Sequence, residues 1–415
     1  PAPRLRGEKN TKGGKQNMKK SKGMQLGALL AALLILSMAF VPAVSAKGET
    51  DIIKNNYVPV KKASEHASVT LLEFIAAGSP GLKNTTWKGA TINPEPLTIY
   101  DINGKKLFYQ FSVEKEGKSV GSIKTSASKV LGSSIVTIGL KHLVWDYDTA
   151  IQMAKNSAKE NYKDSEITST TLVSYSYPKI GIMVKLRDLN TNEERRMFVD
   201  AYDYTIVPEK NSENNESGVW SLYDNIPDEE KVKRISAWNE NDKKFREVTD
   251  KMRSNGIDGS KSLVTTQSIN ILGVSLFAQE QGNYCAPAVG QMIADYHSES
   301  HTQTYIAGRM GTTSTGTSIN GMLSYYRNDL GGTNSVYAFP PVLWQDMVNM
   351  IDASRPFVSM IESSAGNHTR TARGYYENGF KLIAILDPYP VNQGDGYWET
   401  FDVWNLDEHP NIYVY

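Results

Sequence analysis

Residues 279–297 read QEQGNYCAPAVGQMIADYH, and Cys285 within this stretch is the only cysteine of the 415-residue chain. The residues GNY before it are typical of a loop, whereas APAVGQMIADYH after it is typical of a helix with Pro287 in its first turn. A thiol at the N-terminus of a helix lies at the positive end of the helix dipole, which favours the thiolate. The alternative is a buried cysteine without a function, because free cysteine is among the most buried residue types.

A nucleophilic cysteine needs a base, and the spacing along the chain selects one. His297 follows Cys285 by 12 residues on the same predicted helix, so it lies about 18 Å away at 1.5 Å per residue and cannot reach the thiol. His368 instead opens a predicted strand, and Asp387 ends the next one. Neighbouring antiparallel strands bring these two positions together, so Asp387 can orient the imidazole. Taken singly, a loop histidine and a turn aspartate before proline are the commoner explanations.

The tetrahedral intermediate of acyl transfer also needs a hydrogen-bond donor for its oxyanion. Gln279 and Gln281 both lie just before Cys285, and a glutamine amide is a suitable neutral donor. A glutamine in a loop is usually only solvated, so the residues alone leave the choice between the two open.

The N-terminal residues are typical of a secretory signal peptide. Met18 opens MKKSKGMQLGALLAALLILSMAFVPAVSA, in which lysines precede an apolar run and small residues end at Ala46. We expect translation to start at Met18, with residues 1–17 as an upstream segment, and cleavage after Ala46 to give a secreted or cell-surface protein. The alternative is an uncleaved anchor, although the apolar run is short for a span of about 20 residues.

The composition argues against several classes of partner. Lys and Arg together number 45, as do Asp and Glu, so a net charge of zero gives no electrostatic basis for binding nucleic acid. We expect no metal, no cofactor and no stable membrane span after signal removal. Secreted proteins usually pair their cysteines, so a single thiol indicates a reactive group, an intermolecular link or a buried bystander.

The rest of the chain divides into four predicted segments. Residues 47–140 and 141–209 each begin with a helical pattern and continue with alternating strands, which predicts two helix-on-antiparallel-sheet units. Residues 210–262 place a helix between two polar loops and are predicted to be a linker and possible activation region. Residues 263–415 contain Cys285. Together these segments predict an α+β fold.

These motifs resemble the papain-like cysteine peptidases, and in particular the bacteriocin-processing (double-glycine) peptidases and their secreted relatives. The resemblance covers about residues 265–400. It is carried by Gln279, by Tyr284-Cys285-Ala286-Pro287-Ala288 and the helix after it, by His368 opening a strand with Gly374-Tyr375, and by Asp387-Pro388. One departure is Ala286, because the family usually has glycine after the cysteine.

The resemblance implies a papain-like domain, in which the helix bearing the cysteine packs on an antiparallel sheet. It implies Cys285 as nucleophile, His368 as base and then acid, and Asp387 as the residue that orients His368. It also implies Gln279 as the oxyanion donor, because a glutamine six residues before the cysteine has the spacing of the family and Gln281 does not.

The two upstream units more loosely resemble the inhibitory propeptides of secreted proteases. This implies a zymogen whose own N-terminal region is an intramolecular inhibitor, with a protein or peptide as substrate; a binding or adhesion module is the alternative for these units. For the whole chain, the alternatives are an amidase or transglutaminase-type acyl transferase at the same site, or an inactive papain-like surface protein.

Overall fold

The computed structural model describes residues 49–82, 87–142, 145–209, 218–255, 268–339, 342–362, 367–377, 380–401 and 410–415. The predicted signal peptide and the greater part of both predicted polar loops, at 210–218 and 254–262, lie outside the described residues. The described elements from α3 onward belong to one compact unit, Thr50–Tyr415. No helix in the described ranges is long and apolar enough to cross a membrane.

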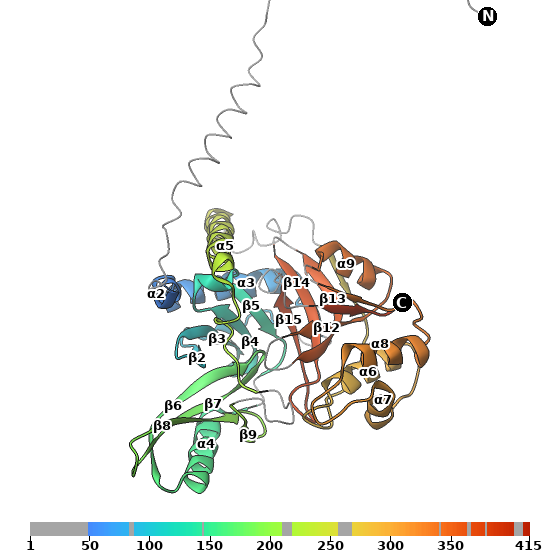
Figure 1. The fold of residues 1–415 in the computed structure, drawn as a ribbon. Coiled ribbons are helices and arrows are strands. Elements are labelled where there is room, and N and C mark those ends of the chain that lie inside the picture. The colour runs from blue at the N-terminus through green and yellow to red at the C-terminus, as the bar shows by residue number, and fades with distance from the viewer. Residues whose placement is uncertain are drawn as a thin grey trace, which may run out of the picture. The chain divides into compact units, whose positions relative to one another are not determined.

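The expected α+β class is confirmed, with helices packed on a large, mainly antiparallel sheet (Figure 1). The helices are α2 (Glu49–Asn55), α3 (Val60–Ala76), the short 3-10 helix η1 (Lys129–Leu131), α4 (Tyr147–Asn161), α5 (Asp228–Asn255), α6 (Cys285–Tyr296), α7 (Gln303–Met310), α8 (Ile319–Asn328) and α9 (Trp344–Asp352).

The strands follow one path through the sheet, in the order β11-β16-β12-β13-β14-β15-β5-β4-β3-β2-β6-β7-β8-β9. Off this path, β1 (Thr91–Ile92) pairs with β3 and β10 (Ser268–Ile271) pairs with β13. The remaining bounds are β2 (Leu97–Asp101), β3 (Lys106–Lys115), β4 (Lys118–Ser126), β5 (Ile135–Gly139), β6 (Ser165–Ser176), β7 (Lys179–Asp188), β8 (Glu194–Asp200), β9 (Ile206–Val207), β11 (Val336–Ala338), β12 (Phe357–Ile361), β13 (His368–Glu377), β14 (Lys381–Asp387), β15 (Asp395–Thr400) and β16 (Asn411–Tyr413).

The N-terminal region, residues 50–209, contains two successive helix-then-strand groups, as the sequence pattern predicts. The first is α3 with β2 to β5, and the second is α4 with β6 to β9. The turn of the β3–β4 hairpin places Glu116 and Gly117 at positive φ, which a glycine adopts without strain. Asp146 caps α4, because its carboxylate accepts a hydrogen bond of 2.8 Å from the Thr149 amide.

Two apolar residues of the helices lie at the surface. Met153 of α4 is 38% exposed, while the buried face of this helix is formed by Ala150, Ala154 and Ala158. Val232 of α5 is 37% exposed, and that helix is anchored instead by Trp238 and Phe245. The buried face of each helix is thus the line of residues that meets the sheet or the neighbouring helix.

The feature that the sequence did not predict is the junction between the N-terminal region and the C-terminal one, residues 268–415. Strand β15 pairs with β5 in antiparallel register, from Tyr397 opposite Gly139 to Glu399 opposite Thr137. The sheet therefore runs without interruption from one region into the other (Figure 1). The segment bounds drawn from the sequence remain a prediction.

A shared core accompanies the shared sheet. Trp398 of β15 is 1% exposed and packs in one cluster with Phe111 and Ile138 of the N-terminal region. Its indole N–H donates a hydrogen bond of 3.0 Å to the carbonyl of Pro80. The two regions thus bury apolar side chains against each other, as the halves of a single folding unit do.

Replacing Trp398 with alanine tests this shared core. Deleting a buried indole removes its burial energy and leaves a cavity, so Trp398→Ala should lower the free energy of unfolding by about 3–5 kcal/mol. Because the indole belongs to both regions, they should still unfold together, which urea titrations followed by far-UV and near-UV circular dichroism would show. Met153→Ala, at an exposed position, should change stability by only about 0.5 kcal/mol. Two separated transitions in the wild-type protein would contradict the shared core.

Candidate active site

Cys285 is the first residue of α6, at the N-terminal end of a 12-residue helix whose buried face is apolar. The helix lies against β13, where the Thr371 hydroxyl donates a hydrogen bond of 3.2 Å to the Met292 sulfur. Ala286 is buried within the helical turn, so the alanine that departs from the family pattern fits the helix without strain. The fold thereby holds the half-buried thiol at the positive end of the helix dipole.

His368 and Asp387 come together across the hairpin of β13 and β14, as their spacing predicts. Thr371 lies opposite Leu386, which places the start of one strand beside the end of the other. His368 Nε2 donates to Asp387 Oδ1 over 2.7 Å, and both side chains are buried. This bond leaves the other ring nitrogen, Nδ1, to face the thiol. The Tyr389 amide also donates to Asp387 Oδ1, over 2.9 Å.

Hydrogen bonding and charge set the ionisation of the three groups. Burial raises the pKa of the Cys285 thiol, but the hydrogen bond and charge of His368, with contacts to Thr369, outweigh burial and lower that pKa to about 6. Burial lowers the pKa of His368, but Asp387 and Cys285 raise it overall above its usual value. Burial raises the pKa of Asp387, and the charge of His368 reverses this and lowers it. The favoured form is therefore thiolate, imidazolium and carboxylate.

Gln279 is held beside these residues by its backbone. Its amide donates to the carbonyl of Pro388 and its carbonyl accepts from the amide of Asn392, both over 2.9 Å, so it is tied to the loop that follows Asp387. Its side-chain nitrogen donates to the carbonyls of Gln281 and Gly282, over 2.9 and 3.0 Å. Both N–H groups of the amide are thus engaged within the loop, and one must turn toward the cleft to donate to an oxyanion. Gln281 also lines the cleft, and its side chain is exposed.

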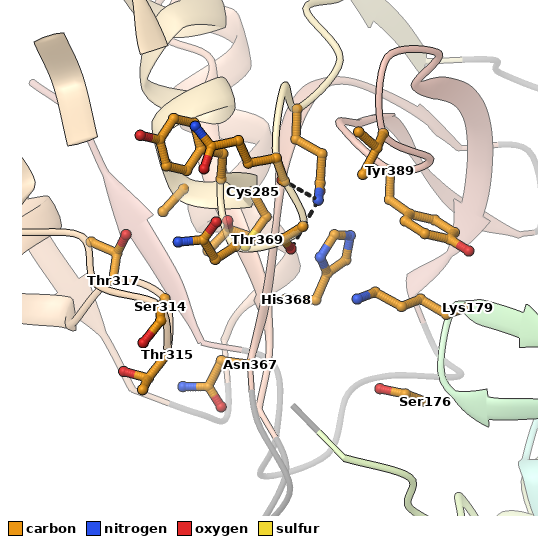
Figure 2. A pocket seen from close by; sticks show the side chains of 18 of the residues that line it. Ser176, Lys179, Cys285, Ser314, Thr315, Thr317, Asn367, His368, Thr369 and Tyr389 are labelled. Atoms are coloured by element: carbon orange, nitrogen blue, oxygen red, sulfur yellow. Dashed lines mark hydrogen bonds between the residues drawn. The ribbon is translucent and has the colours of Figure 1, made fainter. Parts of the chain in front are cut away.

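The thiol opens onto a cleft of about 970 Å³. One side is formed by the loop after α7, with Thr313, Ser314 and Thr315, and the other by the N-terminal region, with Ser176 and Lys179. Figure 2 shows His368 between these two sides, with Lys179 and Tyr389 beyond it. The Lys179 ammonium lies 5.2 Å from the centre of the Tyr389 ring. The described N-terminal residues therefore form one wall of the cleft.

The sequence interpretation missed a buried ionic group behind Asp387. Arg370, two residues after His368 on β13, has no exposed surface and donates to both carboxylate oxygens of Glu399 over 2.8 Å. Arg370 also donates to the Tyr397 hydroxyl over 3.1 Å, and that hydroxyl donates to Asp387 Oδ2 over 3.0 Å. The signal was present in the unusual polarity of the strand after His368, because alternation places Arg370 on the same face as the histidine.

The other chemistry-bearing groups lie apart from this site. His66 is buried against Asp242 and Phe245, and burial lowers its pKa to about 4 although the hydrogen bond that it makes to Asp242 raises that pKa. The ring of His301 contacts the Tyr325 hydroxyl over 2.8 Å. Within the described ranges, the His, Cys, Asp and Glu residues form no group suited to a metal ion.

Comparison with known proteins bears on the C-terminal region. Residues 271–409 match the model of the Peptidase_C39 like family. A similar solved structure is the peptidase domain of Streptococcus ComA, a bifunctional ABC transporter involved in a quorum-sensing pathway. It has 18% sequence identity and a TM-score of 0.28, and the match covers 34% of this chain and 96% of that one. No curated protein matches the chain.

The predicted resemblance to the bacteriocin-processing type of papain-like peptidase is thus confirmed for this part of the chain. Residues 271–409 are similar to the Peptidase_C39 like family, which supports a cysteine peptidase-type domain in this part of the chain.

Proposed function

We propose that this chain is a secreted cysteine peptidase that hydrolyses peptide bonds with Cys285, His368 and Asp387. The observation that carries the proposal is the contact of these three side chains at a cleft, with the pKa of Cys285 lowered to about 6. A lowered thiol pKa at an accessible position is typical of a nucleophilic cysteine, whereas a structural one is inert. The match to a peptidase family favours peptide bonds over other acyl groups.

The reaction follows from the proposed ionisation states. The Cys285 thiolate attacks the carbonyl carbon of the scissile bond. The carbonyl oxygen of the substrate then becomes an oxyanion near the N-terminus of α6. The His368 imidazolium then gives its proton to the leaving amine, so the C–N bond breaks and an acyl-enzyme remains. Neutral His368 next removes a proton from water, whose attack releases the acid and restores the thiolate. Asp387 holds the ring in the required tautomer throughout.

We further propose that Gln279 donates to the oxyanion after releasing one of its two loop carbonyls. Its backbone bonds to the loop after Asp387 support this role, because they fix its position relative to His368. The Gln279 N–H group would turn toward the cleft only when negative charge develops on the substrate oxygen. A hydrogen bond made only in the transition state increases the rate of the chemical step.

The proposed zymogen takes a particular form in this fold. The N-terminal region forms a wall of the cleft and shares a sheet and an apolar core with the C-terminal region. A cut in residues 210–262 would therefore break the covalent connection while the two parts remain bound. Inhibition, in this proposal, comes from the uncut connection rather than from a propeptide that departs.

Alkylation of the single cysteine tests the proposed dyad without any substrate. Iodoacetamide should react with Cys285 in proportion to its thiolate, so the rate should rise through a pH of about 6 in the wild type. In His368→Ala the thiol should return to an ordinary pKa of about 8.5, which lowers the thiolate fraction and hence the rate at pH 7 about thirtyfold. Equal rates in the two folded proteins would contradict the dyad.

Peptide hydrolysis should follow a bell-shaped dependence on pH, because it needs both thiolate and imidazolium. The value of kcat/KM should rise as Cys285 ionises near pH 6 and fall as His368 loses its proton, at a pH above the usual 6.5 of histidine. Cys285→Ser should abolish hydrolysis. A profile with a single limb rising above pH 8 would indicate an ordinary thiol instead.

Gln279→Ala should lower kcat by about 10²–10³ with little change in KM, because it removes a donor that acts in the transition state. Gln281→Ala is the matched control and should leave kcat unchanged, since its side chain is exposed. Alkylation of Cys285 forms no oxyanion, so its rate should be the same in Gln279→Ala and in the wild type. A parallel fall in alkylation would mean that Gln279 only shapes the loop.

Mass spectrometry of the protein recovered from the growth medium tests secretion and activation together. Signal cleavage should give an N-terminus at Lys47. A second N-terminus between about 210 and 262 should appear with time and be absent in Cys285→Ala, if the chain cuts itself. Both fragments should then elute together on gel filtration. An intact chain with full hydrolytic activity would contradict the zymogen.

A further inference from the structure

We infer that the N-terminal region contributes a positioning residue, Tyr177, to the active site. Tyr177 acts on Asp387 through a series of contacts formed by Glu399, Arg370 and Tyr397. This inference rests on the proposed function. It assigns to the N-terminal region a role in supporting the catalytic base, in addition to forming a wall of the cleft.

The contacts form an unbroken series from the base to the N-terminal region. His368 donates to one oxygen of Asp387, and the Tyr397 hydroxyl donates to the other over 3.0 Å. Arg370 donates to the Tyr397 oxygen and, over 2.8 Å, to Glu399. The series ends at Tyr177, in the turn between β6 and β7, whose hydroxyl donates to Glu399 Oε1 over 2.7 Å.

Every member of this series is buried, so water does not screen the interactions. Arg370 forms an ion pair with Glu399. For a buried ion pair, the free energy lost by removing both charges from water is about as large as that gained from their attraction. The pair is therefore poorly explained as a source of stability. It is explained by position: the charge of Arg370 lowers the pKa of Asp387, and its hydrogen bond fixes the Tyr397 hydroxyl that orients that carboxylate.

Tyr177 is the member that the N-terminal region supplies, and its own position is fixed. Its ring packs against Phe108, with 5.8 Å between the ring centres, and lies 6.0 Å from the Lys124 ammonium. By donating to Glu399, it limits how far that carboxylate can turn toward Arg370. Without this bond Glu399 would draw Arg370 from Tyr397, and Asp387 would lose part of its orientation.

A second group from the same region faces the same carboxylates. Lys124 of β4 lines a small polar cavity together with Asp387, Asp395 and Tyr397. Burial lowers the pKa of Lys124 to about 8, although the three nearby carboxylates of Glu399, Asp395 and Asp387 raise it. The N-terminal region thus contributes charge, as well as a hydroxyl, behind the catalytic base.

The test compares three tyrosine-to-phenylalanine variants of the full chain, each of which removes one buried hydroxyl. Tyr397→Phe acts directly on Asp387, Tyr177→Phe acts at the far end of the series, and Tyr109→Phe is the matched control. The Tyr109 hydroxyl is also buried in the N-terminal region and donates to the Val58 carbonyl over 3.0 Å, outside the series. Thermal midpoints verify that each variant is folded.

Two readouts are used: peptide hydrolysis, and the pH dependence of Cys285 alkylation. Tyr397→Phe should lower kcat about tenfold and Tyr177→Phe about threefold, with KM nearly constant, since hydrogen bonds to charged groups are stronger than neutral ones. Both should move the apparent pKa of Cys285 upward, because a less well oriented imidazolium stabilises the thiolate less. Tyr109→Phe should change neither quantity.

The double variant Tyr177→Phe/Tyr397→Phe decides whether the two hydroxyls act in one series. If they do, its kcat should be close to that of Tyr397→Phe alone, because coupled residues are not additive. Effects that multiply, or a Tyr177→Phe profile equal to that of Tyr109→Phe, would overturn the inference. A wild-type Cys285 that alkylates as an ordinary thiol would instead overturn the proposed function, so the two failures are distinct.

Discussion

The antiparallel pairing of β15 with β5 is the interaction on which the rest of the molecule depends. It joins the two regions by backbone hydrogen bonds, and the alternation of side chains along β15 then assigns each residue a direction. Trp398 points into the core shared with the N-terminal region, whereas Tyr397 and Glu399 point toward Arg370 and Asp387. One strand thus contributes an apolar core residue on one face and, on the other, residues that contact the proposed active site.

The ionisation of the site follows from a balance in which burial opposes charge on all three groups. Burial alone would keep the thiol protonated, the imidazole neutral and the carboxyl neutral. Their mutual contacts reverse this for each group, because every member gains a partner of opposite charge. The helix N-terminus at Cys285 adds to the effect without adding a side chain. The charged forms of Cys285 and His368 are therefore stabilised by the three groups together, and no single residue accounts for them.

The sequence predicted the parts of this arrangement that depend on local spacing. The helix at Cys285 and the hairpin between His368 and Asp387 are local patterns, and excluding His297 needed only the rise of a helix. The junction of β5 with β15 joins residues about 260 positions apart, and no local pattern encodes such a pairing. Arg370 and Glu399 were missed for the same reason, because a charged residue in a strand reveals its partner only once the strands are placed.

The pairing of β5 with β15, which the sequence did not predict, changes the interpretation of the N-terminal region. Helix-then-strand order made it resemble an inhibitory propeptide, and a propeptide is expected to separate from its enzyme. A region that shares a sheet, an apolar core and a buried ionic group cannot separate without exposing Trp398 and leaving Glu399 with one donor fewer. Glu399 would keep Arg370 as its partner, but the loss of a buried hydrogen bond to a charged group costs more than the loss of a surface contact. In the proposed zymogen, cleavage would therefore act on a connection between parts that stay together, and the proposed catalytic base would keep the contacts that both regions provide.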